Sequence, residues 1–157
     1  DLQDASNLNQ EDFIDWGEEK KYLKAIGIGE CAGVVIDLIA TLFLESDEKI
    51  ENANEAFGNG VYSGAIYYAY QSIVNSAKAS LLAAEKKTNT HASIISQFDE
   101  EFISSGKIDL GTSFADLIYQ INKFSPTAEF AEKYISDAVR FLQNVRTYRE
   151  IETSVVK

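Results

Sequence analysis

The single histidine of this 157-residue chain, His91, is the first residue whose side chain could act in catalysis or hold a ligand. It lies in the stretch KKTNTHASIISQF, directly after Thr90. An imidazole acts as a general base when a nucleophile or an orienting carboxylate lies within reach, and no such group is adjacent in the sequence. Thr90 can cap the first turn of a helix with its hydroxyl. We therefore expect His91 to mark a helix start, with a ligand contact as the alternative and catalysis as a third interpretation.

The glycine-rich segment AIGIGECAG is a second candidate site. Gly27, Gly29 and Gly33 have the spacing G-x-G-x-x-x-G, one residue longer than the dinucleotide-binding fingerprint, which also needs a preceding strand and a βαβ unit. The surrounding pattern contains no parallel sheet, so we interpret the segment as a hinge that leads into a helix. Cys31 is the only cysteine, which excludes an internal disulfide and a cysteine-rich metal site.

The run YSGAIYYAY concentrates tyrosines on one predicted helix. Aromatic side chains at helical spacing usually pack in a core, but tyrosine is also favoured at interfaces, where one end is buried and the other is wet. The candidate interface residues are Tyr62, Tyr67 and Tyr70. A groove near His91, Tyr68 and Lys78 is the candidate ligand site for a nucleotide.

Three adjacent carboxylates in QFDEEF, Asp99, Glu100 and Glu101, fan around a helix instead of sharing one face. Di-metal sites in helical bundles use Glu-x-x-His motifs on facing helices, and this sequence contains no such motif. We therefore predict neither a metal site nor a cofactor, and we assign no catalytic residue.

Long segments with helical spacing dominate the chain, and no segment alternates long enough to predict a strand. Ser113 and Asp116 have capping-box spacing, and Ser125 followed by Pro126 is typical of a helix start. Short connections favour antiparallel neighbours, so we expect an all-α fold, an up-down bundle of four long helices with one additional short helix. The expected helices are 33–58, 62–86, 91–106, 113–123 and 125–150, with an N-terminal arm or linker over 1–32, a bundle over 33–150 and a C-terminal tail over 151–157.

The net charge of −11 is unevenly distributed. Residues 1–60 contain 14 acidic and 4 basic residues, whereas residues 61–157 contain 11 acidic and 10 basic residues. Phosphate backbones are bound by clustered Lys and Arg, which this chain lacks, so we expect no nucleic-acid partner.

We also expect no membrane association, because Asp37 and Thr41 interrupt the longest apolar run. A single cysteine fits a reducing cytoplasm. The chain begins with Asp1 and contains no Met, which suggests a fragment or processed product of a longer protein.

The stretch AFGNGVYSGAIYYAYQSIVNSAKASLLAAEKKTNTHASIISQFDEEFISSGKI resembles the HEPN family of helical domains. The similar features are the small-residue helix with its Tyr-Tyr-Ala-Tyr core, the AKASLL end, and the Thr90–His91 start followed by IISQFDEEFI. The resemblance covers roughly residues 53–145. It implies an all-α bundle that usually dimerises through its helices.

Many HEPN proteins are ribonucleases in which an Arg is followed about one helical turn later by a His. The arginines of this chain are Arg140, Arg146 and Arg149, and no His follows any of them. The nuclease activity of the family is therefore not implied, and the resemblance assigns His91 to the signature of its helix.

The segment WGEEKKYLKAIGIGECAGVVIDL is similar to the junction before HEPN-type tails of bacterial sulfite or nitrite reductases. That similarity implies upstream reductase domains with haem and iron–sulfur chemistry, and no such cofactor in this chain. We predict a non-catalytic, dimerising accessory domain for assembly or regulation of a larger enzyme. The alternative is a small nucleotide-binding module, and a ribonuclease is less favoured because the Arg-to-His motif is missing.

Overall fold

The structure is a computed structural model that describes residues 28–86 and 88–156. The chain divides into two compact units, residues 1–38 and residues 39–157. In the first unit the described residues, 28–38, are the opening turns of helix α2 (Ile28–Gly58). Most of the expected N-terminal arm, including Gly27, lies outside the described residues. Helix α2 begins before the expected Gly33, so Gly29 and Gly33 lie within the helix and not in a hinge before it.

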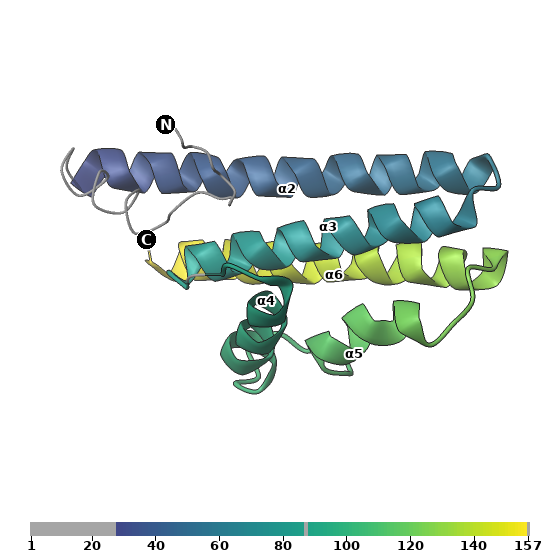
Figure 1. The fold of residues 1–157 in the computed structure, drawn as a ribbon. Coiled ribbons are helices and arrows are strands. Elements are labelled where there is room, and N and C mark those ends of the chain that lie inside the picture. The colour runs from purple at the N-terminus through teal and green to yellow at the C-terminus, as the bar shows by residue number, and fades with distance from the viewer. Residues whose placement is uncertain (1–27, 87, 157) are drawn as a thin grey trace. The chain divides into compact units, whose positions relative to one another are not determined.

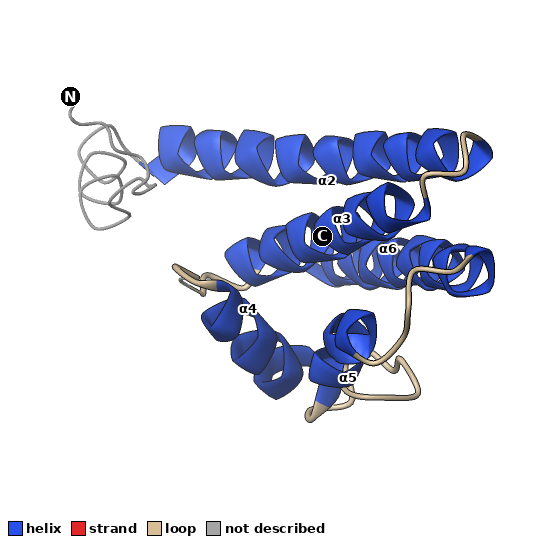
Figure 2. Ribbon diagram, turned by 45° about the vertical axis from the view of Figure 1, so that its right-hand side comes forward, coloured by secondary structure: helices blue, strands red, loops and turns tan. Residues whose placement is uncertain are grey.

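The second unit is built entirely from helices and their connections (Figures 1 and 2). No strand occurs in the described parts of the chain, so the predicted all-α class is confirmed. The last helix continues to Val156, beyond the expected end near Glu150. The elements after α2 are α3 (Tyr62–Ala83), α4 (His91–Phe98), a π-helical turn η2 (Asp99–Ile103), α5 (Phe114–Tyr119), a 3-10 turn η3 (Gln120–Asn122) and α6 (Ala128–Val156).

Helix α3 is the central element of the second unit, and small side chains let its neighbours approach closely. It packs along α6, and both views show the two helices side by side (Figures 1 and 2). Its buried serines are satisfied by backbone carbonyls: the Ser72 hydroxyl donates to Ser46 O of α2 at 3.0 Å, and the Ser76 hydroxyl donates to Ser72 O at 2.8 Å. A buried polar group without such a partner would cost stability. The fully buried alanines of α3 are Ala65, Ala69, Ala77 and Ala79.

Three phenylalanines connect the shorter helices to α6. Phe98 of α4, Phe114 of α5 and Phe141 of α6 are buried, with ring centroids 4.6–5.3 Å apart. These separations lie in the range in which aromatic pairs add stability beyond the area they bury. The cluster therefore holds α4 and α5 against α6.

Two of the predicted helix starts are confirmed by their caps. The Thr90 hydroxyl accepts a hydrogen bond from Ser93 N at 3.0 Å, and the Ser113 hydroxyl accepts one from Asp116 N at 3.0 Å. Both caps satisfy amide groups that have no partner within their own helix.

The predicted cap of the last helix is wrong. Helix α6 begins at Ala128, and the Thr127 hydroxyl accepts from Phe130 N at 3.1 Å. Ser125 and Pro126 therefore precede the cap, and the proline is outside the first turn. Thr127 is itself a favoured capping residue. Because it directly precedes the first residue of α6, Thr127 and not Ser125 caps the helix.

Arg146 joins α6 to α2 across the second unit. Its guanidinium donates two hydrogen bonds of 2.8 Å to the carboxylate of Asp47, and a third of 3.3 Å to Phe43 O. The guanidinium carbon also lies 5.2 Å from the centre of the Phe43 ring. The hydrogen bond from Arg146 lowers the pKa of Asp47 below its ordinary value. This arginine is therefore engaged in holding the fold.

A strained residue, Glu85, lies just after the end of helix α3. Lys86 N donates to Leu81 O at 2.9 Å and Glu85 N donates to Leu82 O at 3.0 Å, which is the Schellman arrangement. Glu85 has a φ of +62°, a left-handed conformation that glycine adopts without steric cost. Among the described residues Glu85 alone combines a side chain with a positive φ.

Replacing Glu85 by glycine is expected to stabilise the protein. Relief of the left-handed strain outweighs the extra freedom of glycine in the unfolded chain by about 0.5–1 kcal/mol. For a domain of this size the melting temperature should rise by about 2 °C. The matched control Glu85→Ala keeps the strained backbone and should melt within about 1 °C of the parent protein. Equal melting of the glycine and alanine variants would show that the strain is absent.

The ion pair between Arg146 and Asp47 is expected to make stability depend on pH in the acid range. Because the folded pKa of Asp47 is lowered, the stabilisation is present above the unfolded pKa of about 3.9 and is lost as the pH falls. The pair is partly exposed, so Asp47→Asn should cost only about 0.5–1 kcal/mol at pH 7. Urea unfolding at pH 7 and near pH 3 measures this difference, which should shrink at the lower pH. Glu48→Gln, an exposed change on the same helix, serves as the control and should be neutral at both.

Candidate functional site

His91 and Tyr70 form a side-chain pair at the start of α4. The Nδ1 atom of His91 lies 2.7 Å from the Tyr70 hydroxyl, and the two rings meet edge to face at 5.8 Å. The Thr90 cap fixes the first turn of α4 and so positions the imidazole. The sequence assigned these two residues to different roles, one to a ligand and the other to an interface, and the structure brings them together.

Two further tyrosines extend this pair over the surface. Tyr67 stacks on Tyr70 at 6.4 Å, and its side chain is 57% exposed. Tyr119 of α5 is 45% exposed. Burial, followed by the neighbouring phenols of Tyr67 and Tyr119, raises the pKa of Tyr70. We call Tyr67, Tyr70, His91 and Tyr119 the tyrosine cluster.

Tyr62 lies apart from the tyrosine cluster. Its ring packs on Phe57 at 5.4 Å, where it braces the turn between α2 and α3. Of the three expected interface tyrosines, Tyr67 and Tyr70 therefore lie together and Tyr62 does not. The tyrosine cluster instead includes Tyr119, which the sequence analysis did not single out. Tyr119 was missed because it belongs to a short helix more than 45 residues farther along the chain.

The residues of the proposed ligand groove come from separate turns of α3, for Tyr68 and Lys78, and from the start of α4, for His91. The Nζ atom of Lys49 on α2 lies 5.6 Å from the centre of the Tyr68 ring. Lys78 follows Tyr70 by eight residues, which is about 12 Å along a helix axis. Among the described residues, no hydrogen bond or ring contact joins His91 to Tyr68 or Lys78.

The three arginines have neighbours other than His91. Arg140 pairs with Asp137 at 3.2 Å, and Arg146 pairs with Asp47. Arg149 lines a separate cavity near the end of α6. The hydrogen-bonding partner of His91 is thus a phenol, and the described part of one chain provides no Arg–His pair.

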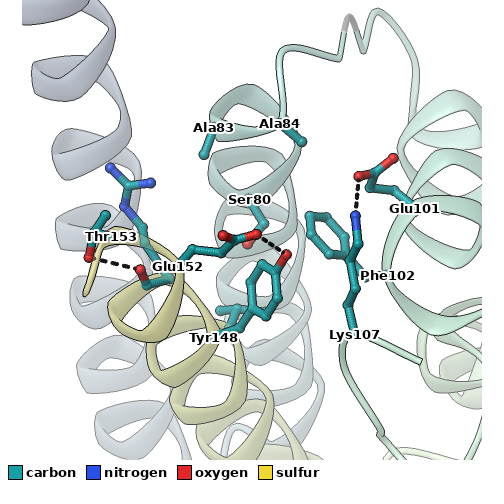
Figure 3. A pocket seen from close by; sticks show the side chains of 11 residues that line it. Ser80, Ala83, Ala84, Glu101, Phe102, Lys107, Tyr148, Glu152 and Thr153 are labelled. Atoms are coloured by element: carbon teal, nitrogen blue, oxygen red, sulfur yellow. Dashed lines mark hydrogen bonds and ion pairs between the residues drawn. The ribbon is translucent and has the colours of Figure 1, made fainter. Parts of the chain in front are cut away.

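That separate cavity has a volume of about 560 Å³ and lies between the end of α3, the η2 turn and the last turns of α6 (Figure 3). The sequence analysis missed it because its walls come from three distant segments, 80–84, 101–107 and 145–153. The sequence signal that could have pointed to it is QFDEEF, which contains Glu101. The lining residues are Ser80, Ala83, Ala84, Glu101, Phe102, Lys107, Val145, Tyr148, Arg149, Glu152 and Thr153.

The η2 turn places Glu101 in the wall of the cavity. The preceding Asp99 carboxylate anchors the turn, because it accepts hydrogen bonds from Phe114 N at 2.7 Å and Ala115 N at 3.1 Å. Lys107 donates to Glu101 at 3.0 Å (Figure 3), and this hydrogen bond is the main cause that lowers the pKa of Glu101. π-helical turns are often found at functional sites.

Tyr148 and Glu152 form the opposite wall. The Tyr148 hydroxyl donates to the Glu152 carboxylate at 2.6 Å (Figure 3). Burial, followed by this hydrogen bond, raises the pKa of Tyr148 to about 12. Arg149 has no side-chain hydrogen bond or ion pair with another described residue.

The described residues contain no group of three or more His, Cys, Asp or Glu side chains placed to hold a metal ion. None of the helices in this part of the chain has both the length and the apolar character needed to cross a membrane.

Comparison with known proteins identifies the family. The model of the HEPN domain matches residues 39–151. A protein of Methanocaldococcus jannaschii named "Putative toxin MJ0605" is 30% identical over 115 residues, which cover 69% of this chain and 86% of the relative. The resemblance seen in the tyrosine helix and in the Thr90–His91 start thus extends over most of the described helices, and the chain belongs to the HEPN domain family.

Proposed function

We propose that this chain is a HEPN-family assembly domain that pairs with a second copy of itself through the tyrosine cluster. In this proposal it has no Arg–His ribonuclease centre of its own. The observation that supports the pairing is the tyrosine cluster, in which the exposed Tyr67 and Tyr119 accompany a hydrogen-bonded Tyr–His pair.

Tyrosine suits such a contact because it provides a large rigid surface with a polar tip. The hydrogen bond to His91 and the stacking on Tyr67 fix the Tyr70 ring before any partner arrives. A surface that is already ordered loses less conformational entropy on binding. A two-fold axis would bring the same residues of both copies together, as in most homodimers.

Charge favours this face for self-association. Two copies of a chain with a net charge of −11 repel each other, and most of the excess lies in residues 1–60, with a net charge of −10. Residues 61–157 have a net charge of −1, and the tyrosine cluster contains no carboxylate. Contact between like-charged surfaces is costly, so the nearly neutral half is the favoured side for a second copy.

The absence of a nuclease centre is supported by the positions of the arginines. Arg146 is held by Asp47, and Arg140 pairs with Asp137. A stabilising cation for a cleaved phosphodiester would have to reach the imidazole of His91, and Tyr70 is the hydrogen-bonding partner found there.

The larger assembly stays a prediction. A role as the C-terminal part of a sulfite or nitrite reductase would make the paired domain a scaffold for upstream catalytic domains. A cytoplasmic location also stays a prediction. The nucleotide-binding alternative stays one too, and its residues are His91 at the start of α4 and Tyr68 and Lys78 on α3.

The relative named as a toxin favours a second candidate, cleavage of RNA. The observation that could support it here is the hydrogen-bonded His91–Tyr70 pair, because general acid–base catalysis needs a positioned imidazole or phenol. The charge of the chain and the positions of its arginines speak against it.

The dimer is tested by light scattering coupled to size exclusion. The parent chain of 17.4 kDa should elute at about twice its mass at micromolar concentration. The double variant Tyr67→Glu, Tyr119→Glu should be monomeric, because it places like charges opposite each other in the contact. The control Ser136→Glu, Gln143→Glu adds the same charge on exposed positions of α6 and should stay dimeric. A monomeric parent, or dissociation by the control alone, would contradict the proposal.

The second candidate is tested by incubating single-stranded and hairpin RNA with the purified protein. We expect no cleavage above that of His91→Ala, because no arginine accompanies the imidazole. Cleavage that is lost in His91→Ala and kept in Lys78→Ala would establish RNA cleavage by this chain and overturn the non-catalytic proposal.

A further inference from the structure

We infer that the cavity between α3, η2 and α6 is a binding site for a free α-amino acid with an apolar side chain. Its carboxylate would pair with Arg149, its ammonium group with Glu152, and its side chain would lie on the apolar floor. This site is separate from the tyrosine cluster and goes beyond the proposed assembly function.

The charges of the cavity walls are arranged for a zwitterion. Arg149 and Glu152 lie three residues apart on α6, a spacing at which opposite charges usually pair. No ion pair joins them: Glu152 accepts the hydrogen bond of Tyr148, and Arg149 has no side-chain hydrogen bond or ion pair with another described residue. A carboxylate uses only part of its accepting capacity in one hydrogen bond, so Glu152 can still accept from an ammonium group.

The other charged wall is already neutralised. Glu101 is held by Lys107 at 3.0 Å and by Lys86 at 3.6 Å. The lining residues therefore carry two positive and two negative groups, Lys107 and Arg149 against Glu101 and Glu152. A zwitterion leaves this balance unchanged, whereas a dianion such as a phosphate monoester would add to the large negative charge of the chain.

The floor of the cavity suits an apolar side chain. Val145 and Phe102 are buried, and the Phe102 ring meets the Tyr148 ring edge to face at 5.5 Å. Ala83 and Ala84 close the side formed by α3 (Figure 3). A volume of about 560 Å³ lies within the range of small-molecule sites.

Two backbone irregularities border the same cavity. The strained Glu85 follows the lining residue Ala84, and the π-helical η2 turn contributes Glu101 and Phe102. Strained residues and π-helical turns cluster at ligand sites, where the local cost is kept because it shapes the site. Their convergence is independent of the charge arrangement.

The test is a titration of the full chain with L-phenylalanine, followed by backbone amide chemical shifts. Resonances of the lining residues, Ala83, Phe102 and Arg149 among them, should move together and saturate in the millimolar range or below. N-acetyl-L-phenylalanine lacks the ammonium group and L-phenylalanine amide lacks the carboxylate, so each should bind about tenfold more weakly or worse. Adenosine monophosphate and inorganic phosphate serve as anionic probes and should leave these resonances in place.

The variants assign the two ends of the ligand. Arg149→Gln should weaken the binding of L-phenylalanine about tenfold and leave the weak binding of L-phenylalanine amide unchanged. Glu152→Gln should also weaken the binding of L-phenylalanine about tenfold and leave the weak binding of N-acetyl-L-phenylalanine unchanged. The control Arg140→Gln removes an arginine of the same helix outside the cavity and should bind as the parent does. Circular dichroism checks that each variant is folded. No saturating shift at the cavity, equal binding of either analogue, or unchanged binding by Arg149→Gln would overturn the inference.

Discussion

The burial of helix α3 on nearly all sides is the constraint on which the second unit depends. A helix in that position must carry small side chains wherever a neighbour's backbone approaches, and any hydroxyl there needs an acceptor. The alanines and serines of α3 meet both conditions, and Ser72 also ties α3 to α2 through Ser46 O. The remaining helices then take their positions against α3 and α6, with the phenylalanine cluster holding α4 and α5 in place.

The tyrosines mark where that burial ends. Tyr67 is exposed on α3 and Tyr70 is partly exposed, and α4 supplies His91 as the partner of Tyr70. Aromatic rings that are fixed on one side and wet on the other form a natural contact surface. Where the burial of α3 is incomplete, its tyrosines form a patch of aromatic surface. This patch belongs to residues 61–157, which carry almost no net charge.

Helix α6 separates two arginines that look alike in the sequence. The Arg146 guanidinium donates hydrogen bonds to Asp47 and to Phe43 O of α2, and these bonds hold α6 against α2. Arg149, three residues farther along, lines the cavity, and its side chain has no such partner in the part of the chain that the structure describes. Three residues turn the helix by about 300°, a net offset of about 60°, and advance it by about 4.5 Å. Arg146 at its position reaches Asp47, whereas Arg149 borders the cavity, so one stabilises the fold and the other is available to a ligand.

The sequence by itself determined the helical class, the positions of the main helices, and the caps at Thr90 and Ser113, because these depend on local periodicity and on side chains that bond to nearby amides. It misplaced the cap of α6, since Ser125 and Thr127 are both competent and only the helix bounds choose between them. The tertiary structure alone decided that His91 contacts Tyr70, that the Tyr119 phenol lies near enough to help raise the pKa of Tyr70, and that Tyr62 packs on Phe57. It also decided that Glu101, Arg149 and Glu152 surround one cavity. These juxtapositions join residues far apart in the chain, and their geometry is set by how the helices pack, which local sequence does not encode.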